Sequence, residues 1–145
     1  MRTSAKKLGV AVAIIVAIAG AYEAGHYLRR MRELGYLDSA IGSMRQLTSA
    51  AQGWADAHPQ QGYPKSIEEM YAAGLIDGTL RLGVKNRYRY TYLPKAPEAD
   101  GRVTDYELHG DPIDNAPTRW HFYTDRTGVL RYSEGAATKL SNPWP

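Results

Sequence analysis

The longest apolar stretch of the chain runs from Leu8 to Tyr22 and contains no charged residue. Basic residues stand on both sides of it, namely Arg2, Lys6 and Lys7 before it and Arg29, Arg30 and Arg32 after it. The interval from Lys7 to Arg29 is roughly twenty residues, about what a helix needs to cross a hydrocarbon core of roughly 30 Å. Backbone groups in lipid must find partners within their own segment, so a spanning piece would be helical. We therefore expect residues 1–9 to form a basic leader and residues 10–28 a transmembrane helix half.

The same stretch also fits a secretory signal peptide, which combines a basic start, a short apolar run and small residues at the cleavage point. Ala19, Gly20 and Ala21 have the small-x-small pattern, and cleavage near Ala21 would leave Tyr22 as the mature N-terminus. The pattern alone leaves both interpretations open. In either of them, the C-terminal part of the chain lies outside the cytoplasm.

Small residues recur every four positions in and just after the apolar run, at Ala13, Ala17, Ala21 and Gly25. On a helix they form a smooth ridge along one side, and such ridges let helices approach closely in lipid or in a bundle. The ridge predicts self-association of the helix. General alanine richness, common in bacterial signal segments, is the alternative explanation.

The helical period continues beyond the basic cluster. Apolar positions three and four residues apart define one stripe, made up of Leu34, Leu37, Ile41, Met44, Leu47, Ala51 and Trp54. This pattern predicts an amphipathic helix half over residues 29–57, with its apolar stripe facing a core. Pro59 and Gly62 mark the end of the helix. We expect one helix from near residue 5 to near Ala57, with Gly35 as the position where a break would fall.

A small globular domain is predicted over residues 58–132. Ser66 and Glu69 form a capping-box pair at the start of a short helix, whereas the segment from Leu80 to Lys85 is ambiguous. The period then changes to two, with tyrosines alternating with arginine and threonine. Four strands are predicted, around residues 88–92, 103–109, 120–124 and 129–132. Short consecutive strands with tight turns favour an antiparallel meander, and residues 133–145 are expected to be a flexible tail.

The predicted fold class is therefore α+β, with a long N-terminal helix packed on a small four-stranded antiparallel sheet. A length of 145 residues allows one compact domain besides the apolar segment. The net charge is +3 and its basic excess lies mostly near the N-terminus, as in a membrane flank. The chain has no cysteine, which excludes disulfides, thiol catalysis and thiolate metal sites.

Several short motifs follow one another along the chain. They are Lys6-Lys7-Leu8-Gly9, Gly62-Tyr63-Pro64, Gly74-Leu75-Ile76-Asp77, the Arg87 to Tyr92 alternation, Asp100-Gly101, Asp111-Pro112, and Phe122 to Arg131. As an ordered set they resemble a type IV pilin or a pseudopilin of type II secretion, closest to the major-pseudopilin type. The resemblance implies a structural subunit of a helical filament, located in the bacterial inner membrane with its C-terminal domain extracytoplasmic. Its implied partners are copies of itself or other pilin-like subunits, bound through the N-terminal helix.

The N-terminal motif departs from that family. Its members are cut after a glycine by a prepilin peptidase, usually before Phe or Met, and carry Glu at the fifth mature position. Here Gly9 and Val10 would flank the cut, and Ile14 occupies the Glu position. These departures leave an uncleaved membrane-anchored relative, or an initiating or minor subunit, as further interpretations.

Little in the sequence points to bond chemistry. The histidines lack metal-ligand spacing, no glycine-rich phosphate loop occurs, and no catalytic residue or enzymatic activity is predicted. The alternation of arginine and tyrosine is typical of a half-buried sheet, so no nucleic-acid partner is expected. The resemblance implies a calcium site in a sheet loop, for which Asp111, Asp114 and Asp125 are the candidates. Turn formation explains the same residues, and no other cofactor is predicted.

Overall fold

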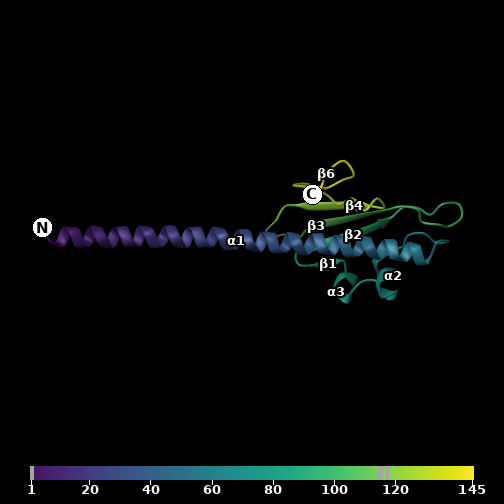
Figure 1. Ribbon diagram of the computed structural model, residues 1–145, viewed down its shortest axis with the longest axis horizontal. Helices are drawn as coiled ribbons and strands as arrows, with labels where there is room; N and C mark the ends of the chain where they lie inside the picture. Colours follow the sequence, from purple (N-terminus) through teal and green to yellow (C-terminus); the bar gives the residue numbers. More distant parts are fainter. Residues whose placement is uncertain (1, 114–115, 117) are drawn as a thin grey trace. The chain divides into compact units, whose positions relative to one another are not determined.

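A computed structural model describes residues 2–113, 116 and 118–145, with side chains from residue 14 onward. It contains a long N-terminal helix and an antiparallel sheet, as the α+β prediction requires (Figure 1). The helices are α1 (Arg2–Ala57), α2 (Ile67–Ala72) and α3 (Gly78–Arg81). The strands are β1 (Val84–Lys85), β2 (Tyr88–Pro94), β3 (Tyr106–Pro112), β4 (His121–Asp125), β5 (Arg131–Ser133) and β6 (Asn142–Pro143). The chain divides into two compact units, Met1–Gly35 and Tyr36–Pro145, and helical backbone is continuous through Gly35.

Within the second unit, the C-terminal half of α1 lies along the sheet (Figure 1). The buried residues of this half follow the predicted stripe and include Leu37, Ile41, Met44, Leu47 and Ala51. They share one hydrophobic core with aromatic and aliphatic side chains of β2, β3 and β4. The apolar period of the sequence therefore identified the face of α1 that packs.

The sheet has six strands in the order β1-β2-β3-β4-β5-β6, each antiparallel to the next. The prediction of four strands was wrong because two short edge strands carry no periodic signal of their own. At one edge, β1 pairs Val84 with Arg89 and Lys85 with Tyr88. At the other edge, β6 pairs with β5.

The C-terminal segment expected as a flexible tail contributes β6 to this sheet. The backbone N–H of Trp144 donates a hydrogen bond to the Leu130 carbonyl at 2.7 Å. Its ring packs edge-on against Phe122 and Tyr132, and Ala137 is buried. The polar composition of residues 133–145 hid this single aromatic anchor, whose contacts lie in β4 and in and beside β5.

One face of β2 is lined with tyrosine, as the alternation predicted. Tyr88 and Tyr90 are buried and Tyr92 is half-buried, whereas Arg89 is exposed. The hydroxyl of Tyr88 donates to the Trp120 carbonyl at 2.8 Å, and that of Tyr92 to the Pro64 carbonyl at 2.9 Å. Burial raises the pKa of Tyr92, which stays a neutral donor. Each ring thus adds apolar area to the core, and these two also satisfy a backbone carbonyl.

Local hydrogen bonds determine the backbone conformation of the segments between α1 and the sheet. The Glu69 backbone N–H donates to Ser66 Oγ at 3.2 Å, as the capping-box pair predicts. The Glu69 carboxylate accepts from the N–H of Lys65, the residue before the cap, at 2.7 Å. The strand predicted to begin at Val103 is β3, and it begins later, at Tyr106. Val103 pairs instead with the segment after α1. The Val103 N–H donates to the Gln61 carbonyl at 2.8 Å.

Two glycines offer a test of this local reasoning. Gly42 lies exposed in α1, and a Cβ there would meet no atom within 4 Å. We expect Gly42→Ala to raise the free energy of unfolding by about 0.5–1 kcal/mol, because alanine loses less backbone entropy in a helix. Urea unfolding followed by circular dichroism would measure the change.

Gly62→Ala is the opposite case for the same experiment. Gly62 has a φ of +76°, and an added Cβ would lie 2.0 Å from the Val103 carbonyl oxygen. We expect a loss of about 2 kcal/mol or more, because the backbone must shift and the bridge to Val103 must break. Equal stability of the two variants would show that this bridge is not formed in solution.

Candidate interaction surface

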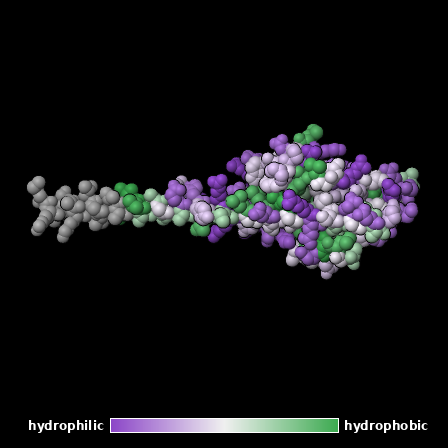
Figure 2. All heavy atoms as spheres, in the orientation of Figure 1, coloured by the Kyte–Doolittle hydropathy of each residue, from purple (hydrophilic) through white to green (hydrophobic). Residues whose placement is uncertain are grey.

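The described part of the first unit is a helix whose bulky apolar side chains are largely exposed. Nine of them retain 48% to 66% of their accessible surface, namely Ile14, Ile15, Val16, Ile18, Tyr22, Tyr27, Leu28, Met31 and Leu34. Figure 2 shows apolar surface on this helix next to the residues drawn in grey. Removing such surface from water yields about 25 cal/mol per Å². This helix is therefore the strongest candidate for an interaction surface.

The apolar side chains point in several directions around the helix axis. Each residue turns the direction by about 100°, so Ile14, Ile15, Val16 and Ile18 cover a little more than half of the circumference and the small Ala17 lies in the remaining arc. A helix that is apolar on all sides belongs in lipid or among other helices. The surface thus suits an environment that encloses the helix.

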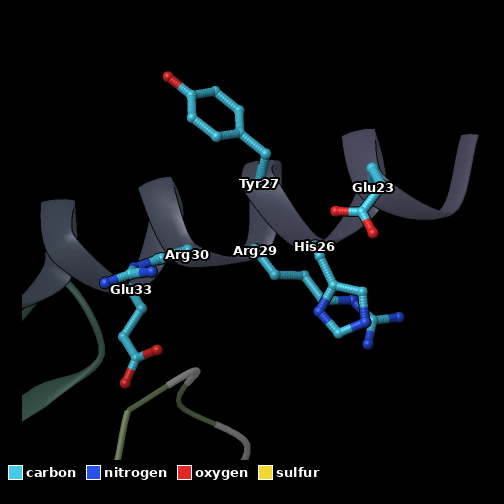
Figure 3. A pocket seen from close by; sticks show the side chains of 6 residues that line it. All are labelled: Glu23, His26, Tyr27, Arg29, Arg30 and Glu33. Carbon is cyan, nitrogen blue, oxygen red and sulfur yellow. The ribbon is translucent and has the colours of Figure 1, made fainter. Parts of the chain in front are cut away.

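A charged collar, which we define as Glu23, Arg29, Arg30, Arg32 and Glu33, follows this apolar part. Four of its members, with His26 and Tyr27, line a groove of about 510 Å³. Figure 3 shows that the six lining side chains come from one helix, with Tyr27 on one side and His26 and Arg29 on the other. A groove bounded by a single helix cannot enclose a small ligand. It can receive a side chain or a surface brought by a partner.

The predicted ridge lies only partly within the described side chains. Ala17 and Ala21 are exposed, and Gly25 is half-exposed with no atom within 4 Å of a Cβ built there. The Ala13 and Val10 side chains lie outside the described part of the structure, as do the surroundings of Gly9 at the predicted prepilin cut. Self-association through the ridge and cleavage at Gly9 both stay predictions.

The predicted transmembrane half, residues 10–28, likewise begins outside the described side chains. Across the side chains that are described, from residue 14 onward, no helix holds an apolar stretch long enough to cross a membrane.

Asp111 and Asp125, two of the three calcium candidates, do not come together. His121 Nδ1 lies 2.6 Å from Asp111 Oδ1, so Asp111 has a histidine partner across β3 and β4. Asp125 pairs in register with Glu107, which is four residues from Asp111 along β3, or about 13 Å. Asp114 lies outside the described residues. Among the His, Asp and Glu side chains that are described, no group of three is placed to hold a metal ion.

Asp125 instead shapes the hairpin between β4 and β5. Its Oδ1 accepts hydrogen bonds from the backbone N–H and the hydroxyl of Thr127, at 2.9 Å and 2.5 Å. Burial acts to raise the pKa of Asp125, but the bonds from Thr127, together with the Lys139 charge and the Tyr123 hydroxyl, outweigh it and the pKa is lowered. The residue therefore acts as a turn-forming carboxylate, the alternative explanation considered for it.

Sequence reasoning placed Tyr27 and Leu28 at the end of the transmembrane half but assigned Met31 to no surface. All three are exposed, and Met31 continues the apolar surface between the arginines of the charged collar. The signal was present, because Tyr27, Met31 and Leu34 follow one another at four and three residues. The interleaved charges masked that period.

Comparison of this chain with protein-family models, with curated proteins and with solved structures finds no match.

The hydrogen bonds of Asp125 predict a pH dependence of stability. Its pKa is lower in the folded than in the unfolded state, so its contribution is present above the unfolded value of about 4 and is lost as the pH falls below it. We expect Asp125→Asn to be less stable than the parent chain at pH 7, with a difference that shrinks toward pH 3. Thermal unfolding between pH 3 and pH 7 would measure it. A difference that is constant over this range would contradict the assignment.

Proposed function

We propose that this chain is a pilin-like structural subunit. Its N-terminal helix anchors it in the bacterial inner membrane and then packs with other copies in a filament or pseudopilus. One observation carries the proposal: the second half of α1 is built into the core of the domain, while residues 14–34 expose nine bulky apolar side chains. A helix that only supported the sheet would need no such side chains beyond its contact with the sheet.

The architecture agrees with this role at the level of fold class. A long N-terminal helix combined with an antiparallel sheet is what the resemblance to pilins and pseudopilins implies. The exposed apolar side chains would be buried by lipid in the membrane and by helices of neighbouring subunits in the filament, since both provide an apolar environment. The subunit would act through packing and would carry out no bond chemistry. Calcium binding in a sheet loop has no further support from the placement of Asp111 and Asp125.

The proposal predicts that a bulky residue on the small-residue ridge weakens filaments. Ala17→Leu adds three carbons where helices are expected to approach most closely. We expect electron microscopy to show few or no filaments, while the domain unfolds at an unchanged temperature. Ile18→Leu is the matched control, since it introduces the same residue without added volume. Normal filaments from Ala17→Leu would contradict packing through the ridge.

The anchoring role predicts the N-terminus of the mature protein. We expect N-terminal sequencing of protein isolated from membranes to begin at Met1 or at Val10, because either leaves the apolar helix attached. A start at Tyr22 would overturn the proposal and support the alternative, a secreted binding domain released by signal peptidase. Val10 would in addition establish processing at Gly9 without the usual Glu at the fifth mature position.

A further inference from the structure

Among the described side chains of the first unit, from residue 14 to residue 35, two charged residues have no Asp, Glu, Lys or Arg of opposite sign on the adjoining turns of their own helix. Neighbours on a helix surface lie three and four residues apart. For Glu23 these positions hold Ala19, Gly20, His26 and Tyr27, and for Arg32 they hold Leu28, Arg29, Gly35 and Tyr36. Neither set contains a Lys or Arg for Glu23 or an acid for Arg32.

The other arginines of the collar differ in this respect. Arg29 and Arg30 lie four and three residues before Glu33, so each has an acid on the adjoining turn. Every ion pair among the described residues involves residues beyond 60, and none includes the collar. Glu23 and Arg32 are thus one acid and one base that have no Lys, Arg, Asp or Glu partner on the described part of their own helix and are free to pair with another copy.

Glu23 and Arg32 lie on opposite sides of α1. Nine residues correspond to two and a half turns at 3.6 residues per turn. Arg30 is seven residues from Glu23, or about two turns, and shares its side of the helix. Both Glu23 and Arg30 line the groove in Figure 3, whereas Arg32 does not.

This placement matches an assembly that repeats. Each copy in an open filament contacts its neighbours through two different faces, whereas a two-fold dimer uses the same face twice. A charge beside apolar surface is costly unless it meets an opposite charge. We propose that Glu23 of one copy forms an ion pair with Arg32 on the opposite face of the next copy. This inference rests on the proposed function, because it names the contact within the assembled helices.

The pair also sets how far neighbouring copies are displaced along the filament. Nine residues at 1.5 Å each place Glu23 and Arg32 about 13.5 Å apart along one helix. Parallel neighbours must shift by about that distance to bring the two charges level. Without the shift, Glu23 would face apolar surface of its neighbour and the pair would not form.

Charge reversal in the full-length protein tests the pair. We expect Glu23→Arg and Arg32→Glu each to reduce filament mass by about tenfold or more, because each places like charges opposite one another. The double variant Glu23→Arg/Arg32→Glu restores the pair with its signs exchanged and should recover most of the filament mass. Glu23→Arg/Arg30→Glu is the matched control, with the same net charge but a partner on the wrong face, and should not recover.

Each other outcome overturns the inference. Equal recovery by the Arg30 control would show a general charge effect, and no recovery by either double variant would show that Glu23 and Arg32 act separately, for instance with Arg32 on a lipid phosphate. Wild-type filaments with an unaffected Glu23→Arg variant would remove this inference and leave the proposed function intact. Absence of wild-type filaments would remove the proposed function itself.

The absence of cysteine from the chain allows a second, independent measurement. Copies carrying Glu23→Cys and differently tagged copies carrying Arg32→Cys would be assembled together and treated with a short bis-maleimide. We expect mixed cross-linked dimers from this combination and at least tenfold fewer from Glu23→Cys with Arg30→Cys. Equal yields from the two combinations would overturn the opposite-face contact.

Discussion

The structure of the second unit depends on the packing of the α1 stripe against the inner face of the sheet. Leu37, Ile41, Met44 and Leu47 supply the helix side of this contact, and tyrosines with Phe122 supply the sheet side. Strands of two to seven residues would be marginal alone, so an adjoining helix is what makes the sheet stable. Close approach requires a small residue on β3, and a Cβ at Gly110 would lie 3.0 Å from Met44 Sδ.

That dependence explains which elements the sequence could predict. The apolar stripe of α1 and the tyrosine alternation of β2 are periodic, and each period reports a face that this one contact buries. Both were read correctly. β1 and β6 have two residues each and cannot show a period, and β6 is held by the ring and backbone of Trp144. The prediction that a strand begins at Val103 was wrong for a different reason: Val103 bonds to Gln61, which precedes α2 and α3 in the chain, and no local pattern reports such a partner.

The candidate site likewise has parts that the sequence could predict and parts that depend on tertiary contacts. The exposed apolar helix was predictable because its apolar residues follow one another without interruption, which is visible in the sequence without any knowledge of tertiary contacts. The acidic candidates were grouped because the resemblance implies a calcium site in a sheet loop. Strand register decides their distance, and it places Asp125 opposite Glu107 and away from Asp111. That Glu23 and Arg32 lack oppositely charged neighbours could be predicted once the segment was known to be helical. The neighbours three and four residues away on a helix can be read directly from the sequence.

Apolar burial and charge would have separate roles in the proposed assembly. The hydrophobic effect is non-directional, so a helix enclosed by similar helices gains nearly the same free energy at many axial positions. Small residues permit close approach at any of several registers, because the ridge repeats every four residues. A single acid and a single base on opposite faces do not repeat, and they favour one displacement over the others. The same logic sets register in coiled coils, where an isolated polar position selects one alignment at some cost in stability.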